Sequence, residues 1–161
     1  MAAARFAVSR VALASACAVA GLGMLGTGSA AQQPSATAAR TLHVGENAHL
    51  HLTSKSGFTL NEEGTAAGTI AGAIYIHLHI ANNRGGVTAE VNIYPRGGSL
   101  SGHGSASYQV RGAQAAFSGT LTITRGTGGY AGAHASGLLF SGTIQRRSDA
   151  VAVQLSGSLT V

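Results

Sequence analysis

The feature that most constrains the fold of this chain is an alternation of apolar and polar residues with a period of two. The alternation begins near Thr41 and continues, with short interruptions, to Val161. Successive side chains of a β-strand point to opposite faces, so this period is typical of strands with one buried face. The pattern predicts an almost all-β domain over residues 41–161 and disfavours a helical bundle.

Seven runs of residues set an apolar face against a polar one. They cover residues 42–52, 70–80, 87–93, 100–108, 115–123, 138–144 and 151–159, and the short segment 57–60 is a candidate eighth strand. The breaks between runs are short and contain Gly, Asn, Pro or Asp, which favours antiparallel neighbours. Glycines within the runs permit the strong coiling that a small barrel needs. We therefore expect an antiparallel closed barrel of about eight strands, with a two-sheet sandwich as the second choice.

The N-terminal segment has the three parts of a secretory signal peptide. Residues 1–10 are short and positive, residues 11–25 are apolar, and small residues follow at 28–31. The interpretation is a signal peptide over residues 1–31, cleaved after Ala30 or Ala31, and a flexible leader over residues 32–40. The protein is therefore expected to be secreted.

The single cysteine, Cys17, lies inside this export segment. A lipoprotein box at Cys17 would leave only about six apolar residues before it, fewer than a signal peptide needs, so lipid anchoring is not expected. The apolar run is also too short, and too interrupted by glycine, for a stable membrane span. The mature domain has no disulfide and must rely on packing and sheet hydrogen bonds.

Charge gives no support for nucleic-acid binding. Of ten basic residues, Arg5 and Arg10 lie in the export segment, so the mature chain carries eight basic against five acidic residues. The eight are scattered, mostly at turns, with no run that could follow a phosphate backbone.

The residues 117–133, FSGTLTITRGTGGYAGA, and 137–144, GLLFSGTI, resemble the late strands of the allene oxide cyclase-like and dirigent-like barrel superfamily. In that superfamily a strand, a Gly-Thr-Gly-aromatic turn and a second glycine-bearing strand recur. The resemblance implies an eight-stranded barrel that associates into dimers or trimers and holds small apolar molecules in its lumen. It also implies cyclase or isomerase activity, although no functional residue of the family matches a position here.

The predicted lumen has little acid-base chemistry. Its apolar faces contain Tyr108 but no charged residue, and Glu62, Glu63, Glu90 and Asp149 are expected on polar faces or at turns. General acid-base catalysis needs a titratable group beside its proton, which argues against hydrolysis, and no catalytic residue or cofactor is assigned.

Four aromatic residues are candidates for ligand contact: Tyr108, Phe117, Tyr130 and Phe140. The inward glycines allow two interpretations, because they either leave room for an apolar ligand or are filled by large side chains across the barrel. The loop 125–135 is the one connection long enough for a functional lip. Tyrosines here could also be packing residues at a rim or subunit contact.

The histidines form a second group of candidate site residues, which consists of the pairs His49 with His51 and His77 with His79. Each pair projects two imidazoles from one face of its strand, and neighbouring strands would bring four rings together. Such a group could bind zinc or copper. The alternative, which we favour, is an exposed polar face or a subunit contact.

These features favour a secreted barrel that binds a small hydrophobic molecule, with cyclase or isomerase activity as an extension. Two alternatives come from other classes. One is a non-catalytic envelope or extracellular structural protein that works through its surface as a homo-oligomer. The other is a histidine-based metal binder.

Overall fold

The computed structural model describes residues 39–81 and 85–161. The predicted signal peptide, Cys17 and residues 32–38 of the leader lie outside the described residues. Within the described part, no helix has both the length and the apolar character to cross a bilayer.

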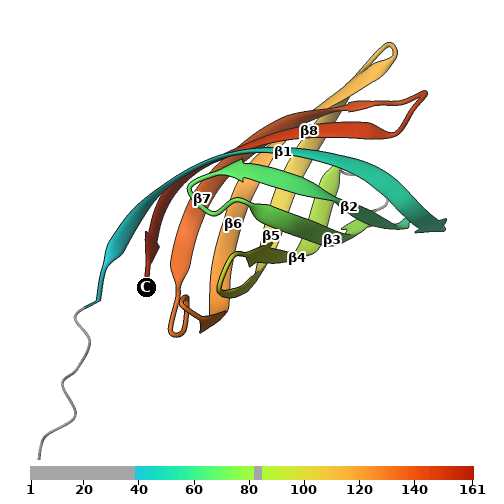
Figure 1. Cartoon of the computed structure of the whole chain (residues 1–161). Helices are drawn as coiled ribbons and strands as arrows, with labels where there is room; N and C mark the ends of the chain where they lie inside the picture. Colours follow the sequence, from blue (N-terminus) through green and yellow to red (C-terminus); the bar gives the residue numbers. More distant parts are fainter. Residues whose placement is uncertain (1–38, 82–84) are drawn as a thin grey trace, which may run out of the picture. The chain divides into compact units, whose positions relative to one another are not determined.

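The domain is all-β and consists of eight strands in a row (Figure 1). The strands are β1 (Thr41–Ser56), β2 (Thr59–Gly68), β3 (Gly72–Ile80), β4 (Gly86–Pro95), β5 (Gly98–Arg111), β6 (Gln114–Gly128), β7 (Ala135–Gln145) and β8 (Ala150–Thr160). Each strand pairs antiparallel with the next, and β8 pairs with β1. The closed barrel confirms the predicted fold and excludes the sandwich.

Strand β2 corrects the sequence interpretation. The segment 57–60 was the candidate eighth strand, but Gly57 and Phe58 form the β1–β2 turn and the strand continues to Gly68. The alternation in β2 is hidden because only two of its four inward residues, Leu60 and Ala66, have an apolar side chain. The other two are Glu62 and Gly64. A glutamate and a glycine on the inner face break the pattern that identifies the other strands.

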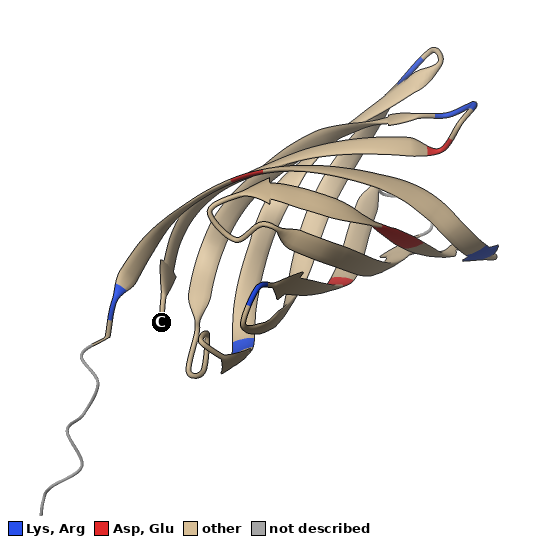
Figure 2. Ribbon diagram, in the orientation of Figure 1, with Lys and Arg blue, Asp and Glu red and all other residues tan. Residues whose placement is uncertain are grey.

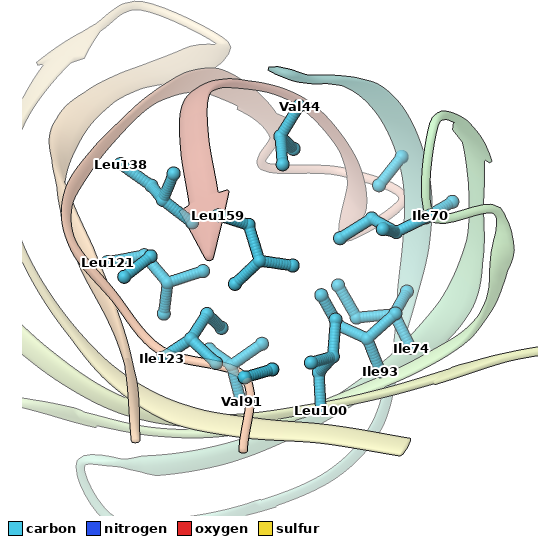
Figure 3. Packing of buried hydrophobic residues seen from close by; sticks show 14 of the residues in the cluster. Val44, Ile70, Ile74, Val91, Ile93, Leu100, Leu121, Ile123, Leu138 and Leu159 are labelled. Carbon is cyan, nitrogen blue, oxygen red and sulfur yellow. The ribbon is translucent and has the colours of Figure 1, made fainter. Parts of the chain in front are cut away.

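One end of the barrel is closed by packed aliphatic side chains (Figure 3). This end contains the β2–β3 turn, the β4–β5 turn and the β6–β7 loop. The largest fully buried side chains of the domain are Ile70, Ile93, Leu100, Leu138 and Leu159. They come from five different places along the chain and converge on the barrel axis, so that the eight strands share one core.

A buried glutamate fastens the β2–β3 turn over this closed end. Glu46 points inward from β1, and its Oε1 accepts a hydrogen bond from the backbone N–H of Ile70. Beside it, the Thr69 hydroxyl donates to the carbonyl of His43 at 3.1 Å and accepts from the N–H of Gly45 at 3.3 Å. Burial raises the pKa of Glu46, and the hydrogen bonds from Ile70 and Thr69 partly offset that rise.

Two of the inward glycines, Gly142 and Gly157, are used for packing. A Cβ at Gly142 would lie 2.4 Å from Cζ of Phe117, and one at Gly157 would lie 2.6 Å from Cδ2 of Leu138. A side chain at either position would force these neighbours to move, and at Gly142 its Cβ would also lie 2.3 Å from the backbone oxygen of Ala152. The missing side chains at Gly142 and Gly157 make room for Phe117 and Leu138 on the neighbouring strands, whereas the inward Gly104 lines open space.

Candidate functional site

The other end of the barrel holds a cavity of about 420 Å³. It opens at the end that carries the β1–β2, β5–β6 and β7–β8 turns. This volume is in the usual range for pockets that bind small molecules, about 300–1,000 Å³. Residues from all eight strands line the cavity, so it is the barrel lumen and not a groove on the outer surface. An eight-stranded barrel is wide enough either to be filled by side chains or to hold one small ligand, and this one does both at different ends.

Aliphatic side chains make most of the cavity wall. Its floor is shared with the closed-end core through residues such as Ile74, Val91 and Ile93, which are buried. Residues nearer the mouth also line it and are only partly buried: Ile76, Leu78, Ile80 and Val87. The space exists because several lining positions are small: Ala89, Gly104 and Ala106.

A single glutamate interrupts this apolar wall. Glu62 points inward from β2, opposite Leu52 on β1 and opposite Ile76 on β3, and its side chain lines the cavity. The residue is only 5% exposed. Among the described residues, no hydrogen bond or ion pair joins the carboxyl group of Glu62 to another residue, since the one ion pair found is between His51 and Glu63. The buried acceptor atom without a hydrogen-bond partner is Oε2 of Glu46 at the closed end. The prediction that Glu62 lies on a polar face or at a turn is wrong, and the expectation that the inward faces carry no charged residue is wrong for Glu46 as well.

The surroundings of Glu62 disfavour its charged form. Burial raises the pKa of Glu62 to about 7, and the negative charge of Asp149 adds to the rise. A carboxyl group with this pKa exists in both protonation states near neutral pH. The lumen therefore contains a titratable group, contrary to the expectation from sequence.

Charged residues surround the mouth of the cavity. Lys55 at the end of β1 lines the opening, and the β7–β8 turn contributes Arg146 and Asp149. Asp149 is the one described non-glycine residue with a positive φ, 52°, which the tight turn requires. Figure 2 shows that Lys and Arg residues gather toward the strand ends and turns. The mouth is thus polar and mixed in charge, whereas the interior is apolar apart from Glu62.

Comparison with protein-family models, with curated proteins and with solved structures finds no match to this chain. The similarity of residues 117–144 to the allene oxide cyclase-like superfamily therefore stays a prediction. What the site can do follows from its own residues.

Three of the four predicted ligand residues line the cavity, and the fourth does not. Tyr108 on β5, Phe117 on β6 and Phe140 on β7 are all part of the wall, and the two phenylalanine rings pack together with centroids 6.2 Å apart. Tyr130 packs against the closed-end core from the β6–β7 loop. That loop covers the floor of the barrel and is not a lip at its mouth. Its length alone could not show which end it closes.

The structure separates the two histidine pairs. His49 and His51 are on β1 and His77 and His79 on β3, with β2 between them, so the four imidazoles do not come together. The described residues contain no group of three or more His, Cys, Asp or Glu able to hold a metal ion.

Three of the four histidines instead contact a residue of β2 on the outer surface. His51 lies 3.4 Å from the carboxylate of Glu63, His77 hydrogen bonds to Asn61, and His79 lies 3.3 Å from the hydroxyl of Thr59. The carboxylate beside His51 is a contact that sequence spacing did not reveal, because Glu63 becomes its neighbour only through the register of β1 and β2.

A second hollow, of about 650 Å³, lies over β1 and β5 to β8. Short polar side chains line much of it, among them Ser107, Ser118, Ser141 and Thr143. These residues are exposed, and they alternate with the inward residues of their strands. The hollow lacks a buried polar group of the kind that marks the lumen, so the lumen is the stronger candidate site.

Proposed function

We propose that this protein is secreted and binds a small apolar molecule in the open half of its barrel. The observation that carries the proposal is the 420 Å³ cavity, walled by aliphatic and aromatic side chains and open at one end. Removing apolar surface from water stabilises a bound guest by roughly 25 cal/mol per Å² of buried area. A wall of Ile, Val, Leu and Phe favours a hydrophobic guest for this reason.

A fluorescent apolar probe tests the proposal directly. N-phenyl-1-naphthylamine is uncharged at neutral pH and becomes bright when it leaves water, so titration of the mature protein gives its Kd. Ala89→Phe adds a ring inside the cavity, and Thr88→Phe adds the same ring to the next residue, whose side chain is exposed outside. We expect Ala89→Phe to weaken probe binding by at least about tenfold, equivalent to about 1.4 kcal/mol, and Thr88→Phe to leave it unchanged.

Equal Kd values for the two variants would contradict binding in the lumen. If the folded wild-type protein binds no apolar probe, the function must lie on the outer surface of the barrel and not in the lumen. That result would favour the alternative of a non-catalytic structural protein.

The secretion part of the proposal rests on residues 1–31, whose charged start, apolar middle and small-residue end are those of a signal peptide. Intact-mass measurement of protein collected from the medium should give a chain that begins after Ala30 or Ala31. Recovery of the uncleaved chain in the cell fraction alone would contradict it.

A second candidate function, proton transfer of the cyclase or isomerase kind, is favoured by Glu62. A carboxyl group with a pKa of about 7 inside an apolar cavity can both give and accept a proton near neutral pH. A small molecule that co-purifies with the protein should then gain deuterium when the complex is incubated in heavy water. Glu62→Gln should bind the molecule but stop the exchange, and exchange that persists in this variant would remove the catalytic proposal.

A further inference from the structure

The lone carboxyl group in the cavity wall indicates what kind of apolar molecule the lumen selects. Glu62 is 5% exposed and lies between aliphatic neighbours, with Leu52 and Ile76 directly opposite it on the adjacent strands. Acidic side chains are almost never buried in this way unless they are paired. In the described residues, no Lys, Arg or His forms an ion pair with it, since the one ion pair found joins His51 and Glu63 on the outer surface.

We propose that the ligand is an apolar amine whose ammonium group binds the carboxylate of Glu62 while its hydrocarbon body fills the lumen. This inference rests on the proposed function, because it names the class of molecule bound in the same cavity. A buried ionised carboxylate is unfavourable alone, and a cation that reaches it supplies the missing partner.

The position of Glu62 along β2 suits this arrangement. Leu60, two residues nearer the β1–β2 turn, also lines the cavity, so the carboxyl group sits inside the wall and not on the rim. The floor residues Val91, Ile93 and Leu121 lie toward the closed end and are apolar. When the ammonium group is bound at Glu62, the hydrocarbon body of the amine can therefore extend toward the closed end and contact these apolar residues.

The carboxyl group of Glu62, and not the mixed charges at the mouth, favours a cationic ligand over a fatty acid. Asp149 adds a second negative charge whose effect reaches Glu62, and an anion in the lumen would meet both. Lys55 and Arg146 also line the opening and could attract a carboxylate. Both are exposed, and exposed cations at strand ends and turns are well solvated and need no partner. Among the charged residues that line the cavity, Glu62 is the buried one.

Three naphthalene probes with nearly the same body test the charge preference at pH 8, where Glu62 is mostly ionised. They are 1-naphthylmethylamine, which is cationic, 1-naphthylmethanol, which is neutral, and 1-naphthoate, which is anionic. We expect wild-type protein to bind the amine at least about tenfold more tightly than the alcohol, and the naphthoate most weakly. Glu62→Gln should remove the preference for the amine, and Glu63→Gln, which changes the adjacent outward residue, should retain it.

The outcomes separate this inference from the proposed function. Equal binding of the three probes, or tightest binding of the naphthoate, would overturn the amine proposal and leave an apolar binding site in place. Failure of all three to bind, together with N-phenyl-1-naphthylamine, would remove the proposed function itself. Loss of the preference in Glu63→Gln as well would also overturn the inference. The wild-type comparison of amine with alcohol needs no variant, so it decides the matter even if Glu62→Gln does not fold.

Discussion

The closed end and the open end of this barrel share the same eight strands and the same alternation but are filled in different ways. At the closed end, Ile70, Leu100, Leu138 and Leu159 meet on the axis and are at most 1% exposed. At the open end, the inward residues include Ala89, Gly104 and Ala106, and a cavity remains. The comparison shows what decides where an apolar barrel is filled and where it is hollow. It is the total volume of the inward side chains that lie at the same level along the barrel axis.

The largest expected effect of a substitution lies in the closed end. Leu100 is fully buried, so Leu100→Ala should leave a cavity and lower the free energy of unfolding by about 3 kcal/mol. Ile76 borders an existing cavity, and Ile76→Ala should cost only about 1 kcal/mol. Urea unfolding followed by circular dichroism measures both, and equal losses would show that the two ends are packed alike.

A second effect concerns the acidic group of the open end. The pKa of Glu62 is raised from 4.5 to about 7 in the folded protein, so between these values the folded state binds more protons than the unfolded state. The contribution of Glu62 to stability is therefore most favourable below about pH 4.5 and is lost as the pH rises through 7. We expect Glu62→Gln to raise the free energy of unfolding by about 2 kcal/mol at pH 8 and to change it little at pH 4.

Urea unfolding of both proteins at the two pH values gives the difference. Glu63→Gln is the matched control, because Glu63 faces outward and should show no such pH-dependent gain. A Glu62→Gln variant that is less stable than wild type at pH 8 would mean that the carboxylate has a partner in the folded protein.

A third comparison adds volume at each end. Ala135 is 8% exposed within the closed-end core, and Ala135→Leu should overpack it and cost about 2 kcal/mol. Ala89 faces the cavity, so Ala89→Leu should change stability by less than about 0.5 kcal/mol. Thermal unfolding distinguishes the two, and an equal cost at Ala89 would mean that the lumen has no free space.

The smallest effect is expected on the outer surface, which belongs to neither end. His51 and Glu63 lie 3.4 Å apart, and their side chains are 64% and 44% exposed. Exposed pairs of this kind contribute little, so His51→Ala should alter the free energy of unfolding by less than about 0.5 kcal/mol between pH 5 and pH 8. A larger change in urea unfolding would show that the outer face of β1 and β2 has a structural role.

The sequence predicted the barrel because alternation is a local signal. In most strands the apolar face is read from spacing alone, and Tyr108, Phe117 and Phe140 were placed on inward faces that do line the cavity. Strand β2 was missed as a full strand because its inner face carries Glu62 and Gly64. The most informative residue of the site was hidden for the same reason, since a lone glutamate in a short strand looks like a residue on a polar face.

The histidines show what spacing cannot supply. The two pairs are well separated in sequence, and only the order of strands in the barrel shows that β2 lies between them. The same order brings Glu63 beside His51 and Asn61 beside His77. Contacts across strands depend on register, which short-range patterns do not encode.

The sequence by itself determined the class of fold and the two faces of most strands, because side-chain direction in a strand follows directly from residue parity. Only the tertiary structure decided which end of the barrel is solid and which is open. That choice depends on which inward residues share a level along the axis, and the levels are set by strand stagger and closure of the sheet. The position of Glu62 in an apolar wall, with Asp149 near enough to raise its pKa, is a consequence of the same closure.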